Sequence, residues 1–135
     1  MLKQEPLLGY EVRSSIVNVT STCATIPRPT VGAYSATKGG LLGTSKTDAL
    51  DYGPDKIRVN IVGLGNTDAP LVHKAMPESH MRDCAAKIPM RRNGRPEEQA
   101  NAIVWLCSPQ SDWISGVNLP VDGGLTLNTS GANLE

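Results

Sequence analysis

The chain has 135 residues, of which 39% are apolar and 19% charged. This length and composition are typical of one soluble domain with its own core, so we expect a single domain over residues 1–135. Thirteen Lys and Arg residues balance thirteen Asp and Glu residues. Proteins that bind nucleic acids or anionic membranes usually carry an excess of basic residues. The balanced charge of this chain therefore argues against both kinds of partner.

Cysteine and histidine usage argues against disulfides and metal sites. The three cysteines are an odd number without a CxxC spacing, which is typical of reduced thiols. His73 and His80 have no neighbouring ligand motif, so we expect no metal. The chain shows no apolar run of membrane-spanning length and no apolar signal-peptide core. These features predict a cytoplasmic protein.

The first half of the chain predicts strand, helix and strand. The β-branched run 15–20, Ser-Ile-Val-Asn-Val-Thr, indicates a strand covered on both faces. Residues 33–52 are rich in Ala, Leu and small side chains and stop at Gly53-Pro54, which indicates a helix. The run 57–62 indicates a second strand.

The second half predicts irregular structure followed by a helix and a strand. Residues 66–92 are polar and contain three prolines, so we expect one or two short helices there and mobility rather than core. Met76, His80 and Met81 are candidates for a substrate lid, with a mobile polar loop as the alternative. A helix is expected to begin at Pro96 and reach residue 108.

The last predicted elements are a strand, a turn and a tail. Residues 116–121 indicate the third strand, and Asp122-Gly123-Gly124 a turn whose carboxylate binds backbone amides. We expect Trp113 to pack at the corner before this strand. Residues 126–135 read as a flexible tail.

Alternating strands and helices predict the α/β class. We expect a partial Rossmann-like, doubly wound fold of three layers with about three parallel strands. Helix 33–52 should cover one face of the sheet and helix 96–108 the other.

Candidate acid–base chemistry lies on the first predicted helix. Tyr34 and Lys38 are four residues apart, so they lie one turn apart on the same face. A cation beside a phenol stabilises the phenolate, and a phenol can pass a proton to or from a reacting oxygen. A Tyr-x-x-x-Lys pattern alone occurs by chance in many helices. Ser21 follows the strand 15–20 and adds a hydroxyl to the set.

These motifs occur in a characteristic order. Ser21, Tyr34-Ser35-Ala36-Thr37-Lys38, the run 57–60 (Ile-Arg-Val-Asn), the run 89–98 and a final Val-Asp-Gly-Gly follow one another. Over residues 10–125 the chain resembles the C-terminal half of a short-chain dehydrogenase/reductase.

The resemblance implies roles for individual residues. Tyr34 would be the general acid/base, Ser21 would hold the substrate oxygen, and Lys38 would bind the nicotinamide ribose of NAD or NADP. Gly65 and Thr67, in the loop after the second strand, would join Tyr34 and Lys38 in contacting the cofactor. The same resemblance implies a parallel Rossmann-like sheet.

The chain also departs from the family pattern. No Gly-rich phosphate-binding turn precedes Ser15. Where the family reads Pro-Gly-x-x-x-Thr after the second strand, this chain has Leu64 in place of the proline and Ala69 in place of the threonine. We therefore expect this chain alone to bind NAD(P) weakly or not at all.

Three hypotheses follow for function. The first is an oxidoreductase module that interconverts a carbonyl and an alcohol on a small organic substrate, with the NAD(P)-binding half supplied elsewhere or lost from a whole enzyme. The second is a dehydratase, isomerase or cyclase that uses Tyr34 and Lys38 without nicotinamide. The third is a catalytically silent assembly protein. The sequence specifies neither the substrate nor the choice between NAD and NADP.

Assembly is the last expectation. The strand 15–20 contains neither Pro nor Lys, so an exposed edge there would be open to pairing. In the family this strand is interior, and the following helix packs against its copy in a partner subunit. We therefore expect a homo-oligomer that uses helix 33–52, strand 15–20 or both.

Overall fold

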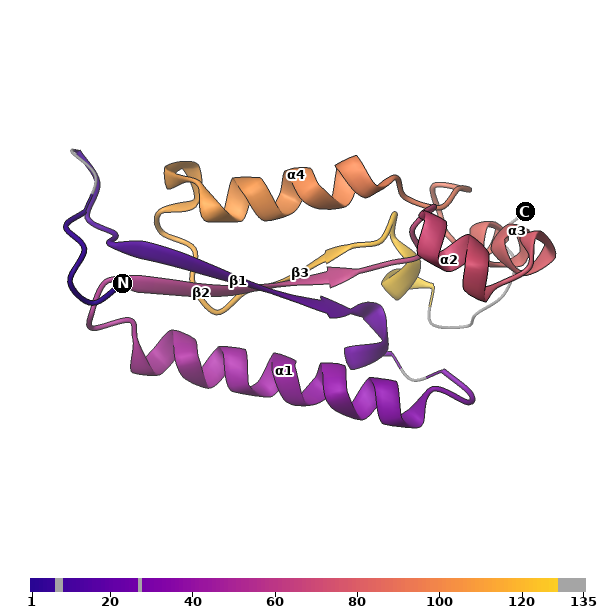
Figure 1. Ribbon diagram of the computed structural model, residues 1–135, viewed down its shortest axis with the longest axis horizontal. Helices are drawn as coiled ribbons and strands as arrows, with labels where there is room; N and C mark the ends of the chain where they lie inside the picture. Colours follow the sequence, from indigo (N-terminus) through magenta and orange to yellow (C-terminus); the bar gives the residue numbers. More distant parts are fainter. Residues whose placement is uncertain (7–8, 27, 129–135) are drawn as a thin grey trace.

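Three parallel strands form one sheet in the order β1-β2-β3: β1 (Ser14–Ser21), β2 (Ile57–Leu64) and β3 (Asn118–Val121) (Figure 1). The computed structural model describes residues 1–6, 9–26 and 28–128. Val59, Ile61 and Val62 of the central strand are fully buried and form the middle of the core. The predicted α/β class with three parallel strands is confirmed.

Two long helices cover opposite faces of the sheet, as predicted (Figure 1). α1 (Gly32–Asp51) lies on one face and α4 (Pro96–Cys107) on the other. Asn18 ties β1 to α1 because its Nδ2 donates to Ser45 Oγ at 2.8 Å. On the other face, Ser15 Oγ donates to the carbonyl of Leu106 in α4 at 2.9 Å. Ser15 and Asn18, on opposite faces of β1, thus bind opposite layers.

Two short helices follow β2 in the region predicted to be irregular. They are α2 (Pro70–Ala75) and α3 (Glu78–Ala86). Met81 of α3 is only 6% exposed and joins Ile88 in the core. The expectation that this region contributes mobility rather than core is therefore wrong at these two residues, because their side chains pack inward. Met76 remains exposed.

Polar side chains of β2 hold the corner before β3. Asn60 is fully buried. Its Nδ2 donates to the carbonyl of Ile114 at 2.7 Å, and its Oδ1 accepts from the N–H of Val117 at 3.1 Å. Arg58 also donates to the Ile114 carbonyl. Trp113, expected to pack at this corner, is fully exposed, because these hydrogen bonds secure the corner without the indole.

The turn after β3 has the predicted hydrogen bonds. Asp122 accepts from the N–H of Gly124 at 2.9 Å and from that of Thr126 at 2.8 Å. β3 begins two residues later than expected, after Gly116 with a positive φ of 79°. A 3-10 turn, Leu125–Leu127, overlaps the start of the predicted tail. The remainder of that tail, residues 129–135, lies outside the described residues.

Candidate active site

The candidate catalytic residues lie where β1 ends and α1 begins. Ser21 is the last residue of β1, and Tyr34 and Lys38 occupy successive turns at the start of α1. The Lys38 ammonium nitrogen lies 5.9 Å from the centre of the Tyr34 ring. The Tyr34 side chain is exposed, so a substrate in solution has access to it.

Lys38 and Ser21 each have a hydrogen bond outside the expected trio. Lys38 Nζ donates to the backbone carbonyl of Val19 in β1 at 3.1 Å. Ser21 Oγ accepts from the N–H of Cys23 at 3.2 Å and caps the 3-10 turn Thr22–Ala24. The structure thus brings Tyr34 and Lys38 together. Ser21 is held by its own turn, and within residues 1–6, 9–26 and 28–128 no hydrogen bond links it to Tyr34 or Lys38.

Gly65 and Thr67 shape the loop after β2. The N–H of Gly65 donates to the Val121 carbonyl at 3.0 Å. A Cβ on Gly65 would lie 2.6 Å from Asp122 Cα, so only glycine fits there without a shift. Thr67 Oγ1 donates back to the Gly65 carbonyl at 3.3 Å, and its backbone bridges to Gly94. Both residues therefore have structural roles in this loop.

Two further polar contacts hold the same loop and were not anticipated from the sequence. His73 Nε2 contacts Asp68 Oδ1 across the start of α2. Arg28, in the loop before α1, donates to Asn66 Oδ1 at 3.3 Å. The sequence signal for the first contact is weak: an acidic residue just before a Pro-initiated helix, with a histidine in that helix. Asp68 is therefore held to α2, and Asn66 is held to the segment that precedes α1.

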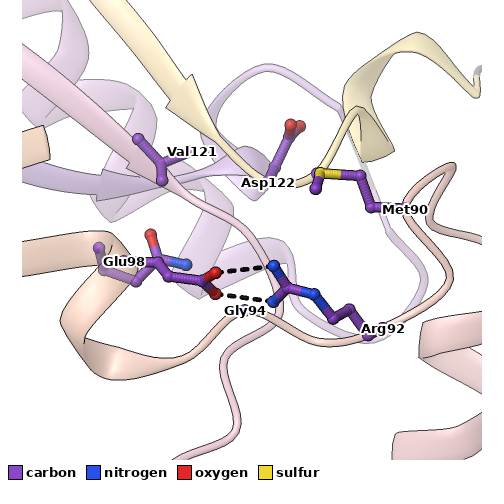
Figure 2. Close-up of a pocket in the computed structure, with 8 residues that line it drawn as sticks. Met90, Arg92, Gly94, Glu98, Val121 and Asp122 are labelled. Carbon is purple, nitrogen blue, oxygen red and sulfur yellow. Dashed lines mark hydrogen bonds and ion pairs between the residues drawn. The ribbon is translucent and has the colours of Figure 1, made fainter. Parts of the chain in front are cut away.

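A small cavity of about 160 Å³ lies beside the end of β3 (Figure 2). Its walls come from the loop before α4, the first turn of α4 and the turn after β3. Figure 2 shows the guanidinium of Arg92 facing the carboxylate of Glu98, with Val121 and Asp122 on the opposite side. The lining residues are Met90, Arg92, Gly94, Glu98, Gln99, Val121, Asp122 and Gly123.

The Arg92–Glu98 ion pair is the strongest electrostatic feature of this cavity. Both terminal nitrogens of the Arg92 guanidinium donate to the Glu98 carboxylate at 2.7 Å, and the backbone N–H of Arg95 donates to it as well at 2.7 Å. These hydrogen bonds, chiefly the pair from Arg92, lower the pKa of Glu98 from 4.5 to about 2. The same pairing raises the pKa of Arg92.

The depressed pKa of Glu98 predicts a loss of stability in acid. A carboxyl group whose pKa is lower in the folded chain stabilises the fold above its unfolded pKa near 4.5, and this contribution disappears as the pH falls toward 2. We expect the melting temperature of the wild-type chain to fall over this range more steeply than that of Glu98→Gln. Thermal melts at a series of pH values measure both slopes. Equal slopes would contradict the prediction.

A larger cavity of about 440 Å³ lies at the opposite end of the strands, next to the exposed Trp113. Arg58 lines it, and burial lowers the pKa of this guanidinium, with Asp112 opposing the effect. Neither cavity is lined by Ser21, Tyr34 or Lys38. Of these three candidate catalytic residues, Tyr34 is exposed, whereas Ser21 and Lys38 are half-buried.

The described part of the chain shows no cluster of three or more His, Cys, Asp or Glu side chains suited to a metal ion. Its helices, as far as the structure describes them, are all too short or too polar to cross a bilayer.

Comparison with known proteins reveals relatives along most of the chain. The family described as Enoyl-(Acyl carrier protein) reductase matches residues 2–126. Glucose 1-dehydrogenase 2 of Bacillus subtilis is 36% identical over 124 residues, covering 92% of this chain and 48% of that protein. The 3-oxoacyl-[acyl-carrier-protein] reductase FabG of Thermotoga maritima is 35% identical over 122 residues, covering 90% and 49%.

Solved structures show the same similarity. The ligand-free aldohexose dehydrogenase of Thermoplasma acidophilum has a TM-score of 0.81 and 36% identity, covering 90% of this chain and 51% of that one. A short-chain dehydrogenase family protein from Francisella tularensis has a TM-score of 0.78 and 30% identity, covering 84% and 51%. This chain spans about half the length of the relatives it matches. In fold and sequence, it belongs to the short-chain dehydrogenase/reductase family.

Proposed function

We propose that this chain is the catalytic half of an NAD(P)-dependent oxidoreductase that interconverts a carbonyl and an alcohol on a small organic substrate. The observation that carries the proposal is the pairing of Tyr34 with Lys38, whose ammonium lies 5.9 Å from the tyrosine ring on an exposed helix start. The named dehydrogenases and reductases among its relatives support the reaction class.

The chain's own residues would handle the proton. Tyr34 would donate its phenolic proton to the substrate oxygen during reduction and recover it during oxidation. The Lys38 ammonium would stabilise the phenolate that remains, because opposite charges at this range attract. Ser21 would hold the substrate oxygen, provided that its hydroxyl turns away from the N–H of Cys23. A bound nicotinamide would supply or accept the hydride.

The residues present fit only one end of such a cofactor. Tyr34 is exposed, and Lys38 uses its ammonium on a backbone carbonyl that a ribose hydroxyl could replace. Thr67 turns its hydroxyl back to Gly65, so it would have to rotate to reach a ligand. The part of the chain that the structure describes contains no Gly-rich turn at a helix start after a strand, the usual site for a pyrophosphate.

We therefore expect the chain alone to bind NAD and NADP more weakly than micromolar. Because the contacts serve the nicotinamide end only, nicotinamide mononucleotide should bind about as tightly as the full dinucleotide. Calorimetry with the mononucleotide and both dinucleotides tests this directly. A dinucleotide that binds at micromolar affinity or tighter would refute it.

Turnover assays separate the three functional hypotheses. Reduction of a 3-oxoacyl thioester or oxidation of an aldohexose at high NAD(P)H or NAD(P) concentration supports the oxidoreductase proposal. Turnover of an enone or β-hydroxy carbonyl without nicotinamide would favour the dehydratase, isomerase or cyclase hypothesis. Absence of both activities in a folded chain, also after addition of the N-terminal half of a relative, would favour the assembly protein.

A further inference from the structure

Arg28 carries a positive charge in the loop that connects Ser21 to Tyr34. Within the described residues its guanidinium makes a single hydrogen bond, from Nη1 to Asn66 Oδ1 at 3.3 Å, and no ion pair. The Nε–Nη2 edge, which is the fork that grips a carboxylate, is therefore without a partner in this part of the chain. The side chain is half-buried, so salt screens its charge less than that of an exposed arginine.

The carboxylate closest in sequence to Asn66 is already paired. Asp68 lies two positions after Asn66, but its Oδ1 contacts His73 Nε2 of α2. The charge of Arg28 is therefore not compensated by the loop on which it rests. The chain as a whole has no net charge, so attraction of an anion to this loop would come from local groups rather than from a general field.

Asn66 is a fixed anchor for the guanidinium. Its backbone carbonyl accepts from the N–H of Gly94 at 2.9 Å, and the N–H of Asp68 donates to the Gly94 carbonyl at 2.7 Å. These hydrogen bonds hold residues 66–68 against the segment before α4. An arginine that rests on a fixed acceptor loses less side-chain freedom when it binds a ligand, which favours binding.

The loop that presents Arg28 is strained at Thr30. The φ of this residue is 67°, a left-handed conformation that is unfavourable for a β-branched side chain. Such conformations cost on the order of 1–3 kcal/mol and cluster at active sites and ligand-binding loops. The strain therefore lies in the turn that leads from Arg28 into α1.

Arg28 is held at the end of the sheet that carries the candidate catalytic residues (Figure 1). Ser21 pairs in register with Leu64, and neighbouring strands lie about 4.8 Å apart. Asn66 follows Leu64 by two residues, which together span at most about 7 Å. The Asn66 backbone therefore lies within about 12 Å of that of Ser21. This is the length of a small organic molecule, so one substrate can contact both Ser21 and Arg28.

We propose that Arg28 binds a carboxylate of the substrate, which makes the carbonyl or alcohol compound an oxo acid or a hydroxy acid. This inference rests on the carbonyl–alcohol chemistry proposed above and adds the class of substrate to it. The carboxylate accepts from the Nε–Nη2 edge while Asn66 holds Nη1, and the reacting oxygen lies toward Ser21 and Tyr34. Hydrogen bonds between charged groups are about twice as strong as neutral ones, so a neutral amide of the same acid binds less tightly.

NMR titration of the chain with two oxo acids and their amides tests the carboxylate. The probes are 4-oxopentanoate and 6-oxoheptanoate, each beside its amide, which has nearly the same size but no charge. At least one acid should bind about fivefold or more tightly than its amide, and the Nε–H resonance of Arg28 should shift with that acid only. Equal affinities within both pairs would overturn the proposal.

Arg28→Gln and Arg82→Gln are matched variants for the same titration. Both remove one positive charge, but Arg82 is an exposed residue of α3 that pairs with Glu78. Arg28→Gln should abolish the preference for the acid, and Arg82→Gln should retain it. A preference that survives Arg28→Gln, or one that disappears in both variants, would show that the carboxylate does not bind at Arg28.

Nicotinamide mononucleotide and nicotinamide riboside separate the substrate from the cofactor, because they differ by one phosphate. Arg28→Gln should leave the affinity ratio of this pair unchanged while it removes that of the oxo acid and its amide. The reverse result would assign Arg28 to the phosphate of the nucleotide and overturn the carboxylate site.

These titrations need no turnover, so they separate this inference from the proposed function. A chain that prefers an oxo acid through Arg28, yet shows no oxidoreductase activity, would retain the carboxylate site and count against the function. A chain that reduces neutral carbonyl compounds and shows no preference for the acids would overturn the carboxylate site alone.

Discussion

Replacing Tyr34 with phenylalanine is expected to lower carbonyl–alcohol turnover by about 10²- to 10⁴-fold, the usual contribution of a general acid/base. The substitution removes only the phenolic oxygen. The ring, its exposure and its distance to the Lys38 ammonium remain. Steady-state kinetics should show the loss in kcat at saturating substrate, because proton transfer belongs to the reaction step rather than to binding.

Tyr52→Phe is the matched control for this experiment. Tyr52 caps the far end of α1 and is about as exposed as Tyr34. Its hydroxyl is remote from the Lys38 ammonium, so turnover should be retained. Denaturant unfolding of both variants should match the wild type within about 0.5 kcal/mol. A Tyr34→Phe variant with wild-type turnover would show that the family chemistry is not used by this chain.

Gly65→Ala is expected to destabilise the chain by about 1–3 kcal/mol, the usual cost of forcing a methyl group into a packed site. The added carbon would lie 2.6 Å from Asp122 Cα and 2.7 Å from Asp122 Cβ. Because Asp122 is anchored to the backbone amides of Gly124 and Thr126, the turn has little freedom to move away. Urea denaturation measures the change.

Gly40→Ala provides the contrast. A Cβ on Gly40 would meet nothing within 4 Å, and the residue lies inside α1. Alanine is there expected to stabilise the helix by about 0.5–1 kcal/mol. Effects of the same sign at both positions would contradict the close approach between residues 65 and 122.

The sequence predicted the fold because its patterns are local. β-branched runs, the stop at Gly53-Pro54 and the start at Pro96 located strands and helices to within about two residues. The parallel sheet, with one long helix on each face, followed from the alternation of strands and helices and from crossover handedness. Met81 and Trp113 were misjudged because their burial depends on distant neighbours: Met81 joins Ile88 in the core, and polar groups of β2 replace the indole at its corner.

The candidate site was predictable as a set of positions but not as a set of contacts. Spacing alone placed Lys38 one turn from Tyr34. That Lys38 instead binds the Val19 carbonyl depends on which way β1 presents its backbone, and this follows only from the register with β2. The backbone bridge between Thr67 and Gly94 was likewise not predictable, because no pattern in the sequence relates these two loop segments.

Asn60 has a consequence for how the chain is made. Its two hydrogen-bond partners, Ile114 and Val117, lie 54 and 57 positions further along the chain. Until the ribosome has released that segment, Asn60 lacks both partners, and burying its amide unsatisfied would cost about 1–3 kcal/mol. Full burial of β2 is therefore less favourable before residues 114–117 emerge, after α2, α3 and α4 have been synthesised.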